Sequence, residues 1–158
     1  MTTLARYDEA ATAASTLHVV FKIGNAEYVL PTETVVQIES YTGATFVPGA
    51  PPFVAGIVQL RGRVVPVVDM RVRFGGRAVA PTLDSRIVVG QQGERLVGLL
   101  VDAAREVLQI RAADLKPPPR LLEDQSSGFI RAVGQVGPRL LMLIDFAKVI
   151  GEEIVDVG

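Results

Sequence analysis

An internal repeat is the feature of this sequence that most constrains its fold. Residues 53–75 align with residues 129–151 without a gap, at a constant offset of 76 residues (129 − 53). Five positions are identical, whereas average residue usage would give roughly one or two matches by chance. The identical pairs are Phe53/Phe129, Gln59/Gln135, Arg63/Arg139, Asp69/Asp145 and Gly75/Gly151. At eight further positions an apolar residue faces an apolar residue, so the chain is predicted to contain two similar units.

Each repeat has the pattern of a β-hairpin. The apolar runs FVAGIVQL and RVVPVVD flank Arg61-Gly62, and FIRAVGQV and RLLMLID flank Gly137-Pro138. Each hairpin is preceded by a similar strand–turn–strand stretch, LHVVFKIGNAEYVL or RIVVGQQGERLVGLL, and the abundant valine favours strands. The chain is therefore predicted to be mostly β. Units of some five short strands, over about 17–76 and 85–151, favour two packed β-barrels over one open sheet.

Short helices are predicted at three places. Residues 31–39 begin with a proline and hold Val35 and Ile38 at helical spacing, which predicts one or two turns of helix. Asp69 and Asp145 each follow an apolar strand, and each is predicted to N-cap a short helix.

The remaining segments are assigned from their composition. Residues 1–16 lack a hydrophobic period and predict a disordered tail, with a short frayed helix as the alternative. Residues 17–151 form the folded domain, and residues 152–158 a short C-terminal tail. Residues 41–47 predict a further strand, and Pro66 must lie at a sheet edge or a bulge because proline cannot donate to a ladder.

Composition excludes several kinds of site. Hydrophobic residues make up 49% of the chain, which rules out disorder for the body of it. The chain has no cysteine and one histidine, His18, so disulfides, Cys-ligated metals and multi-His metal sites are excluded. With a formal net charge of −1, the chain lacks the excess of basic residues expected for binding nucleic acid or an anionic membrane. Without a signal peptide or an apolar run of roughly 20 residues, the protein is predicted to be cytosolic.

Catalysis is the least favoured hypothesis. Two equivalent aspartates, Asp69 and Asp145, invite comparison with the shared carboxylates of aspartic proteases. Here they are followed by Met-Arg-Val and Phe-Ala-Lys, which are helix starts, so N-capping is the better interpretation. No nucleophile elbow or phosphate-binding glycine motif occurs. The sequence therefore predicts no catalytic residue, no cofactor and no metal, although an enzyme remains a third hypothesis that mutation of both aspartates would test.

The segment QLRGRVVPVVDMRVRFG resembles the signature of the CheW-type coupling proteins of bacterial chemosensory arrays. That signature reads approximately NLRG-x-V-x-PVVDLR-x-x-F, and this chain departs from it at Gln59 and Met70. The likeness extends over about residues 17–151, through the first hairpin IGNAEYVL and the stretch at residues 93–102. It implies two five-stranded SH3-like β-barrels packed together, in agreement with the repeat.

The resemblance also implies a non-enzymatic adaptor. Such proteins bridge the cytoplasmic tip of a chemoreceptor, a helical hairpin, and the regulatory domain of a CheA-type histidine kinase, beneath the inner membrane. An accessory CheW-like protein, which binds receptors or array rings without coupling a kinase, is the alternative.

The resemblance further implies a receptor-binding groove between the two barrels. The matching residues in this chain are Val35, Ile38, Gly56, Arg61, Gly98 and Val107. The family often has an acid where this chain has Gln37; if that acid pairs with Arg61, two alternatives follow for this chain, that Glu39 replaces it or that the contact is weaker. No motif identifies the residues that would contact the kinase.

Overall fold

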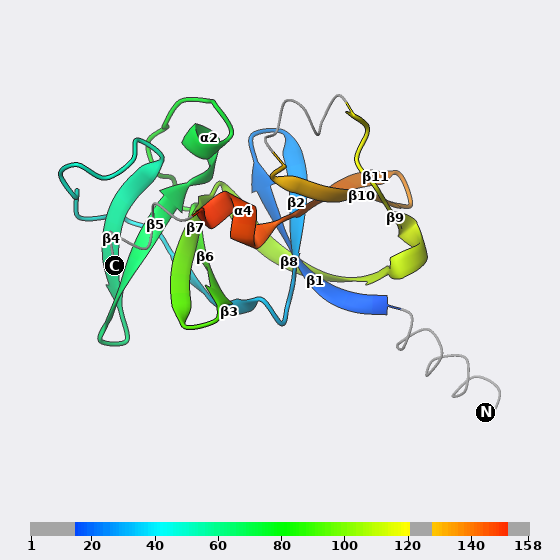
Figure 1. Cartoon of the computed structure of the whole chain (residues 1–158), viewed down its shortest axis with the longest axis horizontal. Coiled ribbons are helices and arrows are strands. Elements are labelled where there is room, and N and C mark those ends of the chain that lie inside the picture. Colours follow the sequence, from blue (N-terminus) through cyan, green and yellow to red (C-terminus); the bar gives the residue numbers. More distant parts are fainter. Residues whose placement is uncertain (1–14, 121–127, 152–158) are drawn as a thin grey trace.

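Two β-sheets make up most of the molecule (Figure 1). The computed structural model describes residues 15–120 and 128–151. The six-stranded sheet has the order β8 (Ala103–Arg111), β1 (Ser15–Ile23), β2 (Ala26–Pro31), β11 (Arg139–Ile144), β10 (Ile130–Val136) and β9 (Leu115–Lys116). The five-stranded sheet has the order β3 (Val35–Ser40), β6 (Arg86–Gln92), β7 (Arg95–Val101), β5 (Arg63–Asp69) and β4 (Val54–Leu60). The prediction of a mostly β fold with two sheets is confirmed, with one strand more than expected in the first sheet.

The repeat is visible in the structure. Strand β10 lies 76 residues after β4 at both ends, and helix α4 (Phe146–Ile150) begins 76 residues after α2 (Met70–Arg73). Both aspartates cap these helices as predicted: Asp69 accepts hydrogen bonds from the backbone N–H groups of Arg71 and Val72, and Asp145 from that of Lys148. Equal spacing of apolar residues therefore produced equal local structure.

The sheets do not follow the two halves of the sequence. Strand β3 of the first half pairs with β6 of the second, and β8 of the second half pairs with β1 of the first. Each half places its first two strands in one sheet and its later strands in the other, so each sheet combines strands of both expected units, about 17–76 and 85–151. Periodicity along a strand records which face is buried but does not identify the neighbouring strand.

Residues 31–39 are not helical, so that prediction is wrong. The segment ends β2, makes a turn and forms β3. A β-bulge lies between Val35 and Gln37, which pair with Gly90 and Val89. The extra residue places Val35 and Ile38 on the same face of the strand although they are three residues apart, and that spacing imitates a helix.

Three further predictions concern residues 41–47, Pro66 and the chain termini. Residues 41–47 form no strand beyond a single bridge between Thr45 and Ile57, so the predicted strand is wrong. Strand β5 lies between β7 and β4, so the predicted edge or bulge at Pro66 is wrong; Pro66 is accommodated because it precedes Val67, where pairing with β7 starts. Strand β1 begins at Ser15, inside the predicted tail, and the rest of both predicted tails lies outside the described residues.

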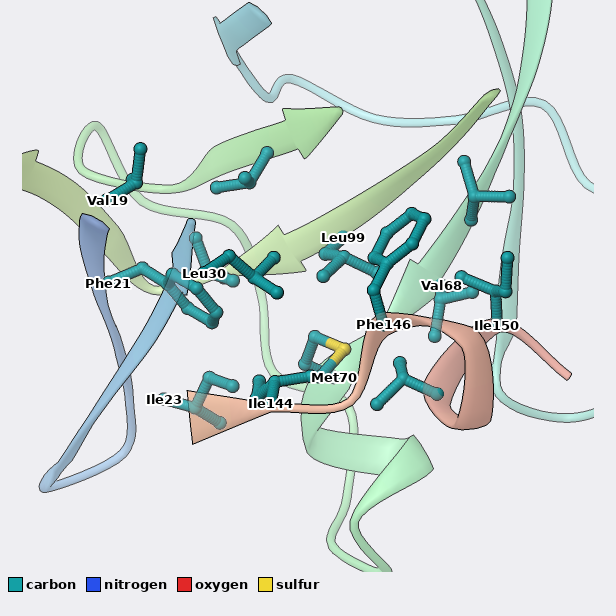
Figure 2. Close-up of a cluster of buried hydrophobic side chains, with 14 of the residues drawn as sticks. Val19, Phe21, Ile23, Leu30, Val68, Met70, Leu99, Ile144, Phe146 and Ile150 are labelled. Atoms are coloured by element: carbon teal, nitrogen blue, oxygen red, sulfur yellow. The ribbon is translucent and has the colours of Figure 1, made fainter. Parts of the chain in front are cut away.

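The largest core cluster is built from both sheets (Figure 2). Phe21 and Leu30 enter it from the six-stranded sheet, and Val68 and Leu99 enter it from the five-stranded sheet. Helix α4 adds further apolar side chains, among them Phe146, and in Figure 1 it lies between the two sheets. This shared core fixes the two sheets against each other, and in the described part of the chain no helix has the length and apolar character needed to cross a membrane.

Candidate functional site

The edge strands β3 and β8 flank the same core cluster from different sheets. In β3, Ile38 pairs with the buried Val88, and in β8, Val107 pairs with Val19. Val19 and Val88 belong to one core cluster between the sheets, and cross-strand partners point to the same face of a sheet. Ile38 and Val107 therefore lie on the faces that turn toward the shared core, where each sheet ends.

Four exposed apolar side chains lie on the edge strands β3 and β8 and on β1, the neighbour of β8. Ile38 is 39% exposed and Val107 53%, and the neighbouring Val36 and Leu17 are 49% and 51% exposed. Leu17 lies two residues before Val19 on the same face of β1, and its carbonyl accepts a hydrogen bond from the backbone of Thr32 in the turn that leads to β3. We call Leu17, Val36, Ile38 and Val107 the edge strip.

Two members of the edge strip were missed in the sequence. Leu17 follows from the alternation Leu17–Val19–Phe21 once β1 is known to be a strand with one face on the core. Val36 was hidden by the bulge, since it is the extra residue in β3 and breaks the alternation. Val35, which was predicted to line the groove, is half-buried against the shared core instead.

The two predicted glycines lie inside the five-stranded sheet and away from the edge strip. A Cβ atom on Gly56 would lie 2.2 Å from the carbonyl oxygen of Thr45, and one on Gly98 would lie 2.4 Å from Cγ2 of Ile87. Gly56 thus allows Thr45 to pair beside β4, and Gly98 leaves room for a core side chain. Neither glycine presents a surface to a partner.

Arg61 occupies the tip of the β4–β5 hairpin. It is exposed and has φ of +50°, which makes it the one non-glycine residue with a positive φ in residues 15–120 and 128–151. Arg61 forms no ion pair with Glu39, whose carboxylate instead accepts a hydrogen bond from the side-chain amide of Gln37 at 2.8 Å. Ile38 and Val107 thus lie at the edges of the two sheets on faces that turn toward the shared core, and Arg61 lies on a separate element, the β4–β5 hairpin.

The charged residues beside Val107 are bound to other elements. Glu106 accepts two hydrogen bonds from Arg139, which lowers the pKa of this carboxyl group. Arg105 forms an ion pair with Asp84, in the segment before β6. These contacts hold β8 at the two residues just before Val107, so the exposed Val107 is presented on an anchored segment.

The described residues offer little reactive chemistry. Asp69 and Asp145 are occupied as helix caps, so their N-cap interpretation is confirmed. His18 is buried in β1, where its Nδ1 donates to the carbonyl oxygen of Thr16 at 2.9 Å. Within residues 15–120 and 128–151, no three His, Cys, Asp or Glu side chains are placed to hold a metal ion. The edge strip is suited to binding another protein.

Comparison with known proteins agrees with this architecture. The model of the CheW-like domain family matches residues 17–153. This chain belongs to the CheW-like family. It is 36% identical over 135 residues to the chemotaxis protein CheW of Rhizobium meliloti (strain 1021), covering 85% of this chain and 87% of the relative. It is 31% identical over 134 residues to the chemotaxis protein CheW of Klebsiella aerogenes, covering 85% and 81%.

The fold is also similar to a solved CheW structure. The crystal structure of the scaffolding protein TtCheW from Thermoanaerobacter tengcongensis superposes with a TM-score of 0.79 at 28% sequence identity. The match covers 85% of this chain and 92% of that protein. The signature at residues 59–75 therefore identified the CheW-like family correctly.

Proposed function

We propose that this CheW-like protein is a cytoplasmic adaptor that couples methyl-accepting chemoreceptors to a CheA-type histidine kinase in membrane-associated arrays. The observation that carries the proposal is the edge strip, which exposes four apolar side chains on three strands (β1, β3 and β8) of a CheW-like scaffold. Family membership supplies the partners, and the edge strip supplies a surface for one of them, the receptor tip.

The geometry of the edge strip fits a helical partner. Residues two apart on a strand are roughly 7 Å apart, and residues i and i+4 of a helix are separated by about 6 Å along the axis. Val36 and Ile38 on β3 can therefore meet successive turns of one helix, while Val107 and Leu17 contact it from the other sheet. A helical hairpin such as the receptor tip presents apolar side chains with this spacing.

The other four predicted residues lie outside the edge strip: three are buried or half-buried, and Arg61 is exposed at the tip of the β4–β5 hairpin. Val35, Gly56 and Gly98 support the binding surface from within, since their neighbours are core or backbone atoms. Arg61 makes no ion pair with any described residue, so its guanidinium is free to bind an acidic or carbonyl group of a partner at the hairpin tip.

Binding to a purified cytoplasmic receptor fragment tests the proposal. Val107→Asp and Ile38→Asp should each weaken binding about tenfold or more, because a charge replaces an apolar contact. Leu140→Asp is the matched control, since Leu140 is 62% exposed but lies on β11, three strands away from β8. Unchanged binding by both edge-strip variants would exclude this surface.

Kinase activity measured with receptor and CheA-type kinase gives the second readout. A coupling protein raises the activity of the kinase in the presence of receptor, whereas an accessory CheW-like protein binds receptor without doing so. If neither receptor nor kinase retains the purified protein, and Arg61→Glu behaves as wild type in cells, the adaptor function is wrong.

A further inference from the structure

Leu83 is the most exposed large apolar side chain in the described residues. It is 97% exposed and lies in the coil that leads from α2 to β6. Single exposed leucines are common and require no explanation by themselves. The surroundings of Leu83 distinguish it, because the turn that carries it is tied down on several sides.

The turn at residues 82–85 is held by its own hydrogen bonds. The backbone N–H of Thr82 donates to Oγ of Ser85 at 2.8 Å, and that of Asp84 donates to Oγ1 of Thr82 at 3.1 Å. The guanidinium of Arg86 donates to the carbonyl oxygen of Leu83 at 2.8 Å. The Leu83 backbone is thus fixed before any partner arrives, which reduces the entropy lost on binding.

Three further contacts place this turn at one end of the edge strip. Asp84 forms an ion pair with Arg105, two residues before Val107 in β8. The carbonyl oxygen of Ser85 accepts a hydrogen bond from the backbone of Tyr41, directly after β3, and Arg86 pairs with Ser40, two residues after Ile38. The turn therefore contacts both β3 and β8, which carry three of the four residues of the edge strip.

We infer that Leu83 extends the edge strip and contacts the same helical partner one turn further along. Val36, Ile38 and the Ser40 position follow one another at steps of roughly 7 Å on β3, and the Leu83 turn lies beside the last of them. Such steps match apolar residues at i, i+4 and i+8 of a helix. This inference rests on the proposed binding of the receptor tip and adds a contact to it.

Leu83→Asp tests the contact through affinity for the purified receptor fragment. The expected result is a five- to tenfold weaker affinity, with Leu140→Asp unchanged, and Leu83→Ser should fall between Leu83→Asp and wild type. Because the Leu83 side chain is almost fully exposed to solvent, the melting temperature of Leu83→Asp should equal that of the wild type. Wild-type affinity of a folded Leu83→Asp variant would overturn the inference and leave the proposed function intact.

Site-directed cross-linking gives an independent readout. The sequence contains no cysteine, so Leu83→Cys creates the only thiol and can carry a photoreactive benzophenone. This label should cross-link the receptor fragment, whereas the same label at Leu140→Cys should not. Cross-links only between copies of this chain would overturn the inference. If the wild-type protein does not bind the receptor fragment at all, both the inference and the proposed function are wrong. If only the Leu83 variants keep wild-type affinity, the inference is wrong and the proposed function stands.

Discussion

The β4–β5 and β10–β11 hairpins correspond residue by residue, yet their tips differ. Arg61 of the first hairpin aligns with Gly137 of the second, and Arg63 aligns with Arg139. Arg139 donates to Glu27 at 2.7 Å and to Glu106 at 2.6 Å, and so joins β11 to β2 and β8. Arg61 and Arg63 are exposed, and neither forms an ion pair with a described residue.

The difference shows how one scaffold serves two purposes. The second tip is used internally, because Arg139 ties three strands of the six-stranded sheet together. The first tip keeps its cations available to solvent. The helices after the hairpins differ as well: Arg73 of α2 aligns with Val149 of α4, and its guanidinium donates to the carbonyl oxygen of Val149 at 2.8 Å. The two hairpins share one backbone pattern, and the acidic partners Glu27 and Glu106 beside Arg139 give the aligned arginines different roles.

Arg73→Ala should have the largest effect on stability, because Arg73 joins the two repeats. Its guanidinium lies 3.8 Å from the ring centroid of Phe53 and 4.8 Å from that of Phe129, which are equivalent residues of the repeat. Two cation–π contacts and a charged hydrogen bond predict a loss of about 2 kcal/mol in the free energy of unfolding. Urea unfolding measures this loss, and Arg73→Lys should recover less than half of the lost free energy of unfolding. A loss below about 0.5 kcal/mol would show that the core alone joins the repeats.

The variants Arg139→Ala and Arg63→Ala compare how much each hairpin tip contributes to the free energy of unfolding. Removing Arg139 leaves Glu27 and Glu106 without their cation, so the free energy of unfolding should fall by about 1–2 kcal/mol. Arg63→Ala should change it by no more than about 0.5 kcal/mol, since Arg63 is exposed and unpaired with any described acid. Equal losses in urea unfolding would contradict the assignment of separate roles.

The hairpins were predictable from sequence because their information is local. Apolar alternation, a turn residue and a capping aspartate fix β4–β5–α2 and β10–β11–α4 without reference to the rest of the chain. The strand β3 was not predictable in this way, since its bulge makes apolar residues recur at a spacing of three. Local periodicity therefore gave the two hairpins, and it failed at β3 and at residues 41–47, where only a single bridge forms.

The binding surface depends on non-local pairing, which the repeat did not reveal. The edge strip exists because β3 and β8 each pair with a strand of the opposite half and become the edges of the two sheets. Family resemblance supplied Ile38 and Val107, but only the pairing shows that they flank one core and that Leu17 joins them. Gly56 and Gly98 carried the same resemblance and proved to be interior positions.

Stability should fall in acid partly through the Arg139 network. Hydrogen bonds from Arg139 lower the pKa of Glu106 in the folded protein below the ordinary 4.5. A lowered pKa means that the carboxylate stabilises the fold above pH 4.5, and this contribution is lost as the pH falls through the folded-state pKa. Urea unfolding between pH 6 and pH 3 should show a smaller decline for Arg139→Ala than for Arg63→Ala. Identical declines would mean that Glu106 titrates independently of Arg139.

The smallest expected effect is a gain in stability from Arg61→Gly. Arg61 has φ of +50°, and the aligned Gly137 has φ of +60°. A left-handed conformation costs an L-residue roughly 1–2 kcal/mol, whereas glycine adds roughly 0.5–1 kcal/mol of unfolded-state entropy. The difference predicts a gain of about 0.5 kcal/mol in the free energy of unfolding. Receptor or kinase binding should weaken in the same variant, since the free guanidinium is removed. A less stable Arg61→Gly would instead show that the Arg61 side chain supports the fold, and the contrast between the two hairpin tips would disappear.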